Sequence, residues 1–147
     1  MDRVRAGIIG CGGIATGKHM PSLQALGNVD MVAFMDVGEE RALAAKERFG
    51  APGSRVYTDY RRLLEQKDID AVHICTPNKS HSEISVAALT AGKHVMCEKP
   101  MAIDGAGARA MVDAAERTGR LLTIGYNNRF RDDSLYLKRC CERGDLG

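Results

Sequence analysis

The 147-residue sequence predicts an α/β fold built on a doubly wound parallel sheet. Short, nearly continuous apolar runs alternate with segments whose apolar residues recur at helical spacing, which is typical of strands covered by helices on both faces. A glycine-rich turn directly follows the first apolar run and leads into a helical segment. These observations favour successive β-α-β units joined by right-handed crossovers.

The strands are expected at the apolar runs 4–9, 29–35, 71–75, 94–97 and 121–125, with a weaker candidate at 55–57. Apolar residues at i, i+3, i+4 and i+7 predict helices around 84–91 and 108–115, which Gly92 and Gly119 end. Further helices are expected around 42–49, 60–64 and 137–141. Residues 1–126 are expected to form one domain, and 127–147 a connector and helix leading to a second domain outside this chain.

Charge and cysteine content narrow the class of protein. Lys and Arg number 21 and Asp and Glu 19, so the net charge of +2 favours neither a nucleic-acid nor a membrane partner. The five cysteines are odd in number and lack metal-site spacing, which favours reduced thiols and no metal site. Because the first five residues also show no secretion signal, a cytoplasmic location is expected.

The first strand runs into Gly10-Cys11-Gly12-Gly13-Ile14-Ala15, which fits the pattern G-x-G-x-x-G/A. The first glycine permits a tight turn, the second lets a pyrophosphate approach the backbone, and the last small residue lets the helix pack on the sheet. Free N–H groups and the helix dipole then attract phosphates. The whole loop is therefore expected to bind a dinucleotide, and Pro21 is expected to kink or end the helix behind it.

Asp36 ends the second apolar run, 21 residues after Ala15. A carboxylate at this place accepts hydrogen bonds from the adenosine ribose hydroxyls and repels a 2′-phosphate, so NAD is expected rather than NADP. Arg41 could offset that repulsion, but we expect it on a solvated helix face. Asp36 could also cap the following helix.

Two further strand ends carry polar residues, and ligands of such sheets bind beyond the carboxyl ends of the strands. The first is Thr76-Pro77-Asn78-Lys79-Ser80-His81 and the second is Glu98-Lys99-Pro100. Lys99 is expected at the site because of its place at a strand end, and Asn78 could cap the next helix. His73 and His94 lie inside strands and are expected in the core, whereas His19 is expected to face solvent.

These residues carry a resemblance to a known family. The glycine loop, Thr-Pro-Asn-x-x-His at 76–81, Ala-Gly-Lys-His-Val-Met-Cys-Glu-Lys-Pro at 91–100 and Gly-Tyr-Asn-Asn-Arg-Phe at 125–130 resemble the glucose–fructose oxidoreductase / inositol dehydrogenase (Gfo/Idh/MocA) family over essentially the whole chain. The resemblance implies an NAD(P)-dependent oxidoreductase that acts on a small sugar or polyol substrate, and a homo-oligomer at full length. It also implies a second domain that supplies most of the substrate pocket, so these residues alone are expected to be inactive.

The resemblance also implies roles for individual residues. Lys99 would be catalytic beside the nicotinamide, because a cation there stabilises the negative charge that a hydroxyl gains as hydride leaves its carbon. Glu98 would bind the nicotinamide ribose, and the Lys99–Pro100 bond would be cis. The other cofactor-binding residues would be Thr76, Pro77, Asn78, His81, Asn127 and Arg129. Asn128 stands where the family often has an arginine.

Two other functions remain open from the sequence. An NAD-dependent glycosidase of the same family would share this domain, because the choice of reaction lies in the substrate pocket. A non-catalytic NAD-binding or sensing module would share the fold, although it has no need of a lysine facing a reacting hydroxyl.

Overall fold

Six parallel strands form a single sheet in the computed structural model, which describes residues 3–147. They are β1 (Val4–Ile9), β2 (Val29–Met35), β3 (Arg55–Tyr57), β4 (Ala71–Ile74), β5 (His94–Cys97) and β6 (Leu122–Ile124). Their order is β3-β2-β1-β4-β5-β6, and every neighbouring pair is parallel. The predicted α/β sheet is confirmed. The expected lack of a secretion signal rests partly on Met1 and Asp2, which lie outside the described residues.

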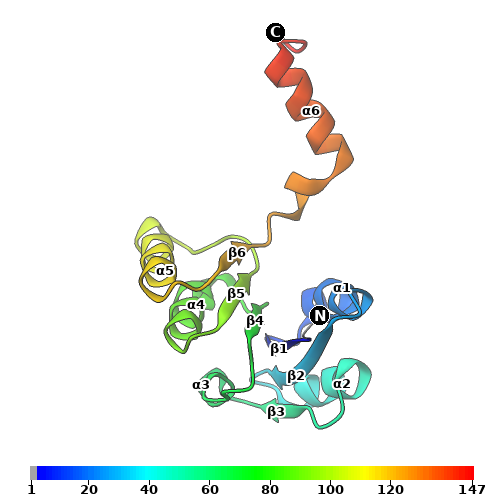
Figure 1. The fold of residues 1–147 in the computed structure, drawn as a ribbon, viewed down its shortest axis with the longest axis vertical. Coiled ribbons are helices and arrows are strands. Elements are labelled where there is room, and N and C mark those ends of the chain that lie inside the picture. Colours follow the sequence, from blue (N-terminus) through cyan, green and yellow to red (C-terminus); the bar gives the residue numbers. More distant parts are fainter. Residues whose placement is uncertain (1–2) are drawn as a thin grey trace.

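Helices cover both faces of the sheet (Figure 1). The helices α1 (Met20–Ala25) and α2 (Glu39–Phe49) lie on one face, and α3 (Tyr60–Leu64), α4 (His81–Thr90) and α5 (Gly105–Thr118) lie on the other. The local sequence sets the helix ends: the Asp104 carboxylate accepts a hydrogen bond from the Gly107 N–H at 2.7 Å, and Gly119 ends α5 at a φ of 64°.

The central strands are apolar because both faces are buried. In β2, the last five residues are all buried, and one core cluster lies on each side of the sheet. The strand order reverses between β1 and β4, since these neighbours lead to opposite halves of the sheet. In such sheets a ligand crevice opens at this reversal, at the carboxyl ends of the strands.

The helix after the glycine loop continues through Pro21, so the expectation that Pro21 ends it was wrong. A π-helical turn, Ala15–His19, precedes α1, and Pro21 lies in the first turn of α1. Proline is tolerated there because a first-turn N–H has no intrahelical acceptor. Because the π-helical turn ends at His19 and α1 begins at Met20, Pro21 lies where the backbone N–H that proline lacks would have no intrahelical acceptor.

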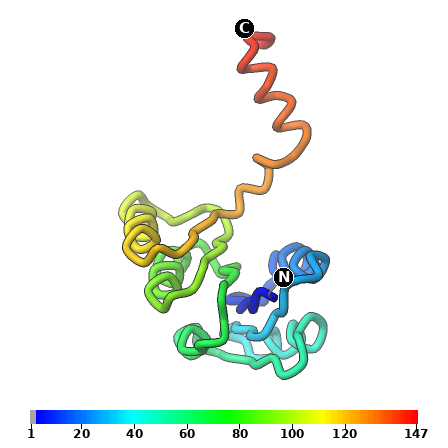
Figure 2. Tube along the Cα trace, in the orientation of Figure 1, coloured from blue at the N-terminus to red at the C-terminus, as the bar shows by residue number. Residues whose placement is uncertain are grey.

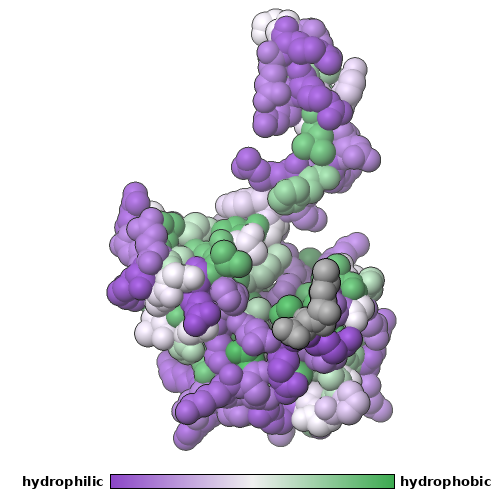
Figure 3. Space-filling view, viewed as in Figure 1, coloured by the Kyte–Doolittle hydropathy of each residue, from purple (hydrophilic) through white to green (hydrophobic). Residues whose placement is uncertain are grey.

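The last helix, α6 (Asp132–Arg143), extends away from the sheet (Figures 1 and 2). It ends at Gly144, as predicted, and Gly144 has a φ of 77°. Large apolar or aromatic side chains at 126–137 are exposed, namely Tyr126, Phe130, Leu135, Tyr136 and Leu137. Figure 3 shows green, hydrophobic areas within this mostly purple segment. The segment therefore presents apolar surface that the rest of residues 3–147 does not cover.

Lys93 is a buried cation that joins two loops at the amino edge of the sheet. Its Nζ donates hydrogen bonds to the carbonyl oxygens of Gln66, at 2.6 Å, and Ile69, at 2.9 Å. Burial lowers the pKa of Lys93, against the opposing effects of Asp68 and Asp70. The lysine of the Ala-Gly-Lys-His-Val segment thus has a structural role in this fold.

We predict that Lys93→Met lowers the free energy of unfolding by about 1–3 kcal/mol, because two carbonyl groups lose a charged donor. Urea denaturation followed by circular dichroism measures this change. Lys67→Met, at an exposed position in the same region, should change it by less than about 0.5 kcal/mol. Equal effects of the two substitutions would contradict the assigned role.

Candidate functional site

The glycine loop begins at a position where only glycine fits. Gly10 has a φ of 91°, and a Cβ built on it would lie 2.8 Å from both the carbonyl carbon and the oxygen of Cys75. Its N–H donates to the Met35 carbonyl at 2.7 Å. The turn after β1 therefore packs directly on the main chain at the ends of its two neighbouring strands.

The next two glycines are not required by the fold. A Cβ at Gly12 or at Gly13 would have no neighbour within 4 Å, so the backbone there faces open space. The helix starts at Gly13, and the N–H groups of a first helical turn have no intrahelical acceptors. Ala15 is fully buried, as expected for the residue that brings the helix onto the sheet. This bare backbone fits a pyrophosphate group, which needs close approach and free N–H donors.

Cys11 differs from its loop neighbours. It is buried, and its N–H donates to the Asp36 Oδ2 atom at 2.9 Å. The backbone donor of Cys11 therefore holds the carboxylate at the end of β2. The loop and the Asp36 carboxylate are thereby fixed relative to each other.

Asp36 lies at the end of β2 with its carboxylate in a network of donors. Its Oδ1 accepts hydrogen bonds from the Gly38 N–H at 2.9 Å and from the Arg41 guanidinium at 2.6 and 3.0 Å. Burial acts to raise the pKa of Asp36, but the Arg41 guanidinium and the N–H groups of Gly38 and Cys11 outweigh it and lower the pKa. Asp36 is therefore an anion at neutral pH, and the N-cap of α2 is Gly38 instead.

Arg41 lies on the solvated face of α2, as expected, and its guanidinium turns back onto Asp36. Its side chain is 58% exposed, yet the guanidinium is bound to the carboxylate. A Cβ at Gly38 would lie 2.9 Å from the Arg41 Nη2 atom, so a glycine at position 38 gives the arginine its room. The ion pair places a cation beside the carboxylate at the mouth of the site.

A cleft of about 720 Å³ joins these residues to the end of β4. The glycine loop, the end of β2 and the segment after β4 all line it, including Asp36, Arg41, Thr76 and Pro77. Asn78 belongs to the same segment but borders a separate hollow beside Ser82 and Asp104. It does not cap α4, whose N-cap is Ser80.

His81 is the first residue of α4 and is fully buried. Its Nδ1 lies 2.7 Å from the Pro100 carbonyl oxygen and its Nε2 lies 2.9 Å from the Thr76 carbonyl oxygen. The ring therefore joins the segment after β4 to the segment after β5. The Lys99–Pro100 peptide bond is cis, as expected.

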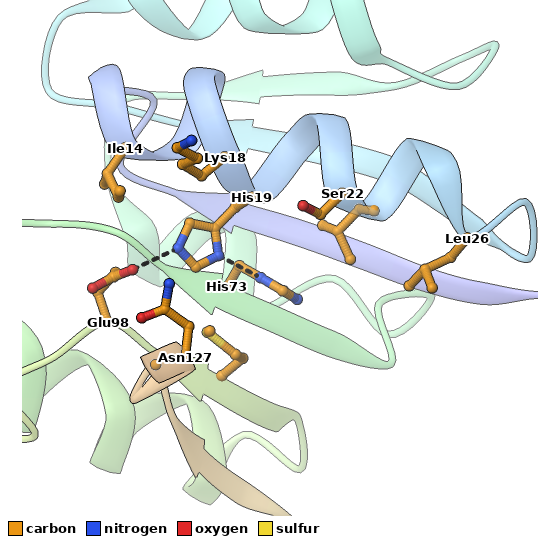
Figure 4. A pocket seen from close by; sticks show the side chains of 11 residues that line it. Ile14, Lys18, His19, Ser22, Leu26, His73, Glu98 and Asn127 are labelled. Atoms are coloured by element: carbon orange, nitrogen blue, oxygen red, sulfur yellow. Dashed lines mark hydrogen bonds and ion pairs between the residues drawn. The ribbon is translucent and has the colours of Figure 1, made fainter. Parts of the chain in front are cut away.

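At the end of β5, Glu98 contacts His19, which in turn contacts His73 (Figure 4). The Glu98 Oε1 lies 2.8 Å from His19 Nε2, and the His19 Nδ1 lies 3.3 Å from His73 Nδ1. His19 is only 9% exposed, so the expectation that it faces solvent was wrong. Burial, and then the neighbouring His19, lowers the pKa of His73 to about 4, so His73 is neutral at physiological pH.

Lys99 is exposed beyond β5, and its ammonium has no hydrogen-bond or ion-pair partner within residues 3–147. It borders a hollow of about 300 Å³ together with Asn127 and Arg129, which follow β6. The structure thus brings Lys99 together with two residues of the segment that follows the next strand. Their common location follows from the parallel order of β5 and β6.

The hollows along this edge share residues. Ile14 lines both the cleft at Asp36 and a hollow of about 540 Å³ that contains Glu98 and His19. Asn127 lines that second hollow and also the one at Lys99. Three hollows, each sharing a lining residue with the next, therefore form a concave path along the carboxyl edge from Asp36, past the glycine loop, to Lys99.

Thiol and metal chemistry have little support at this edge. Burial raises the pKa of Cys11 and of Cys75 to about 12 and that of Cys97 to about 11, so these thiols stay protonated. Across residues 3–147, no group of three or more His, Cys, Asp or Glu side chains is arranged to hold a metal ion.

None of the helices within residues 3–147 has the length and apolar character that a membrane span requires.

This fold and this edge define a dinucleotide-binding Rossmann domain. Residues 4–126 match the family described as "Oxidoreductase family, NAD-binding Rossmann fold" (GFO_IDH_MocA). The chain belongs to this Gfo/Idh/MocA family, which confirms the expected resemblance.

Several curated relatives are polyol or sugar dehydrogenases. The chain is 33% identical over 145 residues to inositol 2-dehydrogenase of Salmonella typhimurium, covering 98% of this chain and 43% of the relative. It is 35% identical over 144 residues to D-glucoside 3-dehydrogenase of Escherichia coli, covering 98% of this chain and 40% of the relative. The chain thus spans less than half the length of these relatives.

Solved structures of the same type carry different cofactors. A 3-ketoreductase from Actinomadura kijaniata, solved with NADP and TDP-benzene, matches with a TM-score of 0.89 at 32% identity. The match covers 99% of this chain and 44% of the chain of that protein. A dehydrogenase from Bordetella pertussis, solved with NADH and UDP-GlcNAcA, matches with a TM-score of 0.90 at 28% identity. The match covers 99% of this chain and 41% of the chain of that protein. Proteins with this fold therefore include one solved with NADP and one solved with NADH.

We predict opposite outcomes for two glycine substitutions in the loop. Gly10→Ala should lower the free energy of unfolding by about 2–4 kcal/mol, because the added Cβ meets main-chain atoms at a positive φ. Gly12→Ala should leave stability unchanged or raise it by up to about 1 kcal/mol, yet weaken NAD⁺ binding at least about tenfold. Denaturation and calorimetric titration measure the two effects.

Gly17→Ala is the matched control for this pair. Gly17 lies on the same helical segment, and a Cβ there also has no neighbour within 4 Å, but it does not border the cleft. Gly17→Ala should leave NAD⁺ binding unchanged and, as a substitution inside a helix, raise stability by up to about 1 kcal/mol. If Gly12→Ala bound NAD⁺ as tightly as Gly17→Ala does, the pyrophosphate would not approach the backbone at Gly12.

Proposed function

We propose that this chain is the NAD-binding domain of an oxidoreductase that transfers hydride between a sugar- or polyol-type hydroxyl carbon and a nicotinamide. The observation that carries the proposal is the concave path along the carboxyl edge, with an anion at one end and an unpartnered lysine at the other. A dinucleotide needs such an extended, chemically distinct path, because its adenosine and its nicotinamide occupy opposite halves of the sheet.

Different parts of the edge would hold different parts of the dinucleotide. The bare backbone from Gly12 to Ala15 would bind the pyrophosphate, and Asp36 would accept the adenosine ribose hydroxyls. Thr76 and Pro77, which follow β4, line the same cleft. Glu98 would bind the nicotinamide ribose, and Asn127 and Arg129 would approach the nicotinamide end, where they border the hollow at Lys99.

NAD is favoured over NADP by charge. The buried anion of Asp36 would repel a 2′-phosphate, and Glu39 and Glu40 begin the next helix. Arg41 is the opposing cation, but its guanidinium is already bound to Asp36. Because the Asp36 carboxylate offsets the positive charge of Arg41, a 2′-phosphate would be attracted there less than by an unpaired arginine.

Lys99 would act on the substrate hydroxyl. The bound nicotinamide supplies the hydride acceptor. The Lys99 ammonium would lie beside the hydroxyl oxygen and stabilise the negative charge that develops there, which a preorganised cation does at little reorganisation cost. Its freedom from any protein partner among residues 3–147 supports this role, since no ion pair has to break first.

The substrate itself would be held mainly by residues outside this chain. The inositol and glucoside dehydrogenases among the relatives support a small sugar or polyol as the substrate class. The exposed apolar side chains on α6 and its connector would then pack against a second domain. We further propose a cytoplasmic, homo-oligomeric protein at full length.

We predict that Asp36→Ala weakens NAD⁺ binding about ten- to hundredfold, because a charged hydrogen bond worth about 1.5–3 kcal/mol is lost. The wild-type chain should also bind ADP more tightly than adenosine 2′,5′-bisphosphate, and Asp36→Asn should narrow that difference. Calorimetry measures all of these affinities. Unchanged NAD⁺ affinity in Asp36→Ala would remove Asp36 from the site.

Lys99→Met tests the proposed function itself. In this chain extended by a second domain of the family, we expect turnover of a polyol to fall by about 10²–10³-fold, with NAD⁺ affinity within about threefold of wild type. NADH production and calorimetry measure the two quantities, and Lys67→Met is the control. Full turnover in Lys99→Met, or turnover by residues 1–147 alone, would contradict the proposal.

A further inference from the structure

The Glu98 carboxylate is held by protein groups on both of its oxygens. Its Oε1 is bound to His19 Nε2 at 2.8 Å, and its Oε2 accepts the Lys99 N–H at 2.9 Å. A Cβ at Gly125 would lie 3.4 Å from the Glu98 carboxyl carbon and Oε1, so that position leaves room for the carboxylate. The orientation of Glu98 is thus set before any ligand arrives.

His19 reaches Glu98 from the opposite side of the hollow (Figure 4). It is the last residue of the π-helical turn, and its side chain extends toward the sheet between Glu98 and His73. π-helical turns are less stable than α-helix and occur frequently at functional sites. The turn places a buried polar ring where the fold alone requires only an apolar residue.

The hydrogen positions follow from the chemistry of the three partners. A carboxylate only accepts hydrogen bonds, so His19 Nε2 carries a hydrogen. The contact between the two Nδ1 atoms holds one hydrogen, which belongs either to His19 or to the neutral His73. In both arrangements His19 continues to donate to Glu98, so the contact survives whichever ring holds that hydrogen.

We propose that His19 is a positioning residue for the nicotinamide half of the site: it holds Glu98, and through Glu98 the main chain of Lys99, in the arrangement that receives the nicotinamide ribose. The inference rests on the proposed function, because it assigns Glu98 to that ribose. His19 does not need to touch the dinucleotide in this account. His19 would affect NAD⁺ binding only through its contact with the Glu98 carboxylate.

The test compares NAD⁺ with ADP in calorimetric titrations of the 147-residue chain. ADP carries the adenosine and both phosphates but lacks the nicotinamide nucleoside, so it reports on the other half of the site. His19→Leu and Glu98→Ala should each weaken NAD⁺ binding about tenfold and leave ADP within about twofold of wild type. The double variant should be no weaker than either single variant, since both remove one shared interaction.

Conservative substitution provides the second arm. His19→Gln keeps an N–H donor that can reach Glu98, so it should restore NAD⁺ affinity to within about threefold of wild type. His94→Gln, at the other end of β5, is the matched control and should change neither affinity. If His19→Leu fails to fold, the comparison of His19→Gln with Glu98→Ala still decides the matter.

Three results would overturn the inference. They are additive losses in the double variant, an equal loss of ADP binding in His19→Leu, and a His19→Gln variant as weak as Glu98→Ala. A wild-type chain that binds neither NAD⁺ nor ADP would instead contradict the proposed function. The two failures are therefore distinguishable.

Discussion

The close approach of the turn after β1 to the end of β4 is the contact on which the rest of the site depends. Gly10 permits it, because any Cβ at that position would lie within 2.9 Å of the main chain of Cys75 and Thr76. With this turn seated, the following backbone lies open along the carboxyl edge. A larger residue at position 10 would push the turn away from the end of β4 and into the crevice at the point where the strand order reverses.

The loops at this edge are fixed by polar side chains that bind main-chain groups, more than by apolar packing. Asp36 binds the N–H of Cys11, His81 binds the carbonyls of Thr76 and Pro100, and Glu98 binds the N–H of Lys99. Each contact joins two strand ends or orders one turn. The edge is therefore organised before a ligand binds, which lowers the entropic cost of binding.

Apolar pattern predicted the sheet with little error because the strands are buried on both faces. The observed β2 and β5 coincide with the predicted 29–35 and 94–97, and β6 is shorter by one residue at each end. The glycine loop and the residues at strand ends could also be located, since parallel strands bring their carboxyl ends to one edge. The spacing of apolar residues along the sequence therefore suffices to predict where the strands lie and which residues follow them.

Side-chain direction could not be read from the sequence. Arg41 has the spacing of a solvated helix face, yet it folds back because Gly38 leaves room and Asp36 attracts it. His19 lies toward the sheet and not in solvent, because a π-helical turn alters which residues of a helix face the sheet. His81 could not be separated from a ligand contact because its carbonyl partners come from two distant loops.

Backbone amide NMR with NAD⁺ titrated into the ¹⁵N-labelled chain tests the central claim most directly, because it locates the ligand without substitutions. Shifts should concentrate at the carboxyl edge, from Asp36 through Gly12 and Gly13 to Lys99 and Asn127. Amides at the opposite edge, such as those of Asp70 and His94, should stay unchanged. Shifts confined to that opposite edge, or spread without preference over the chain, would contradict the account.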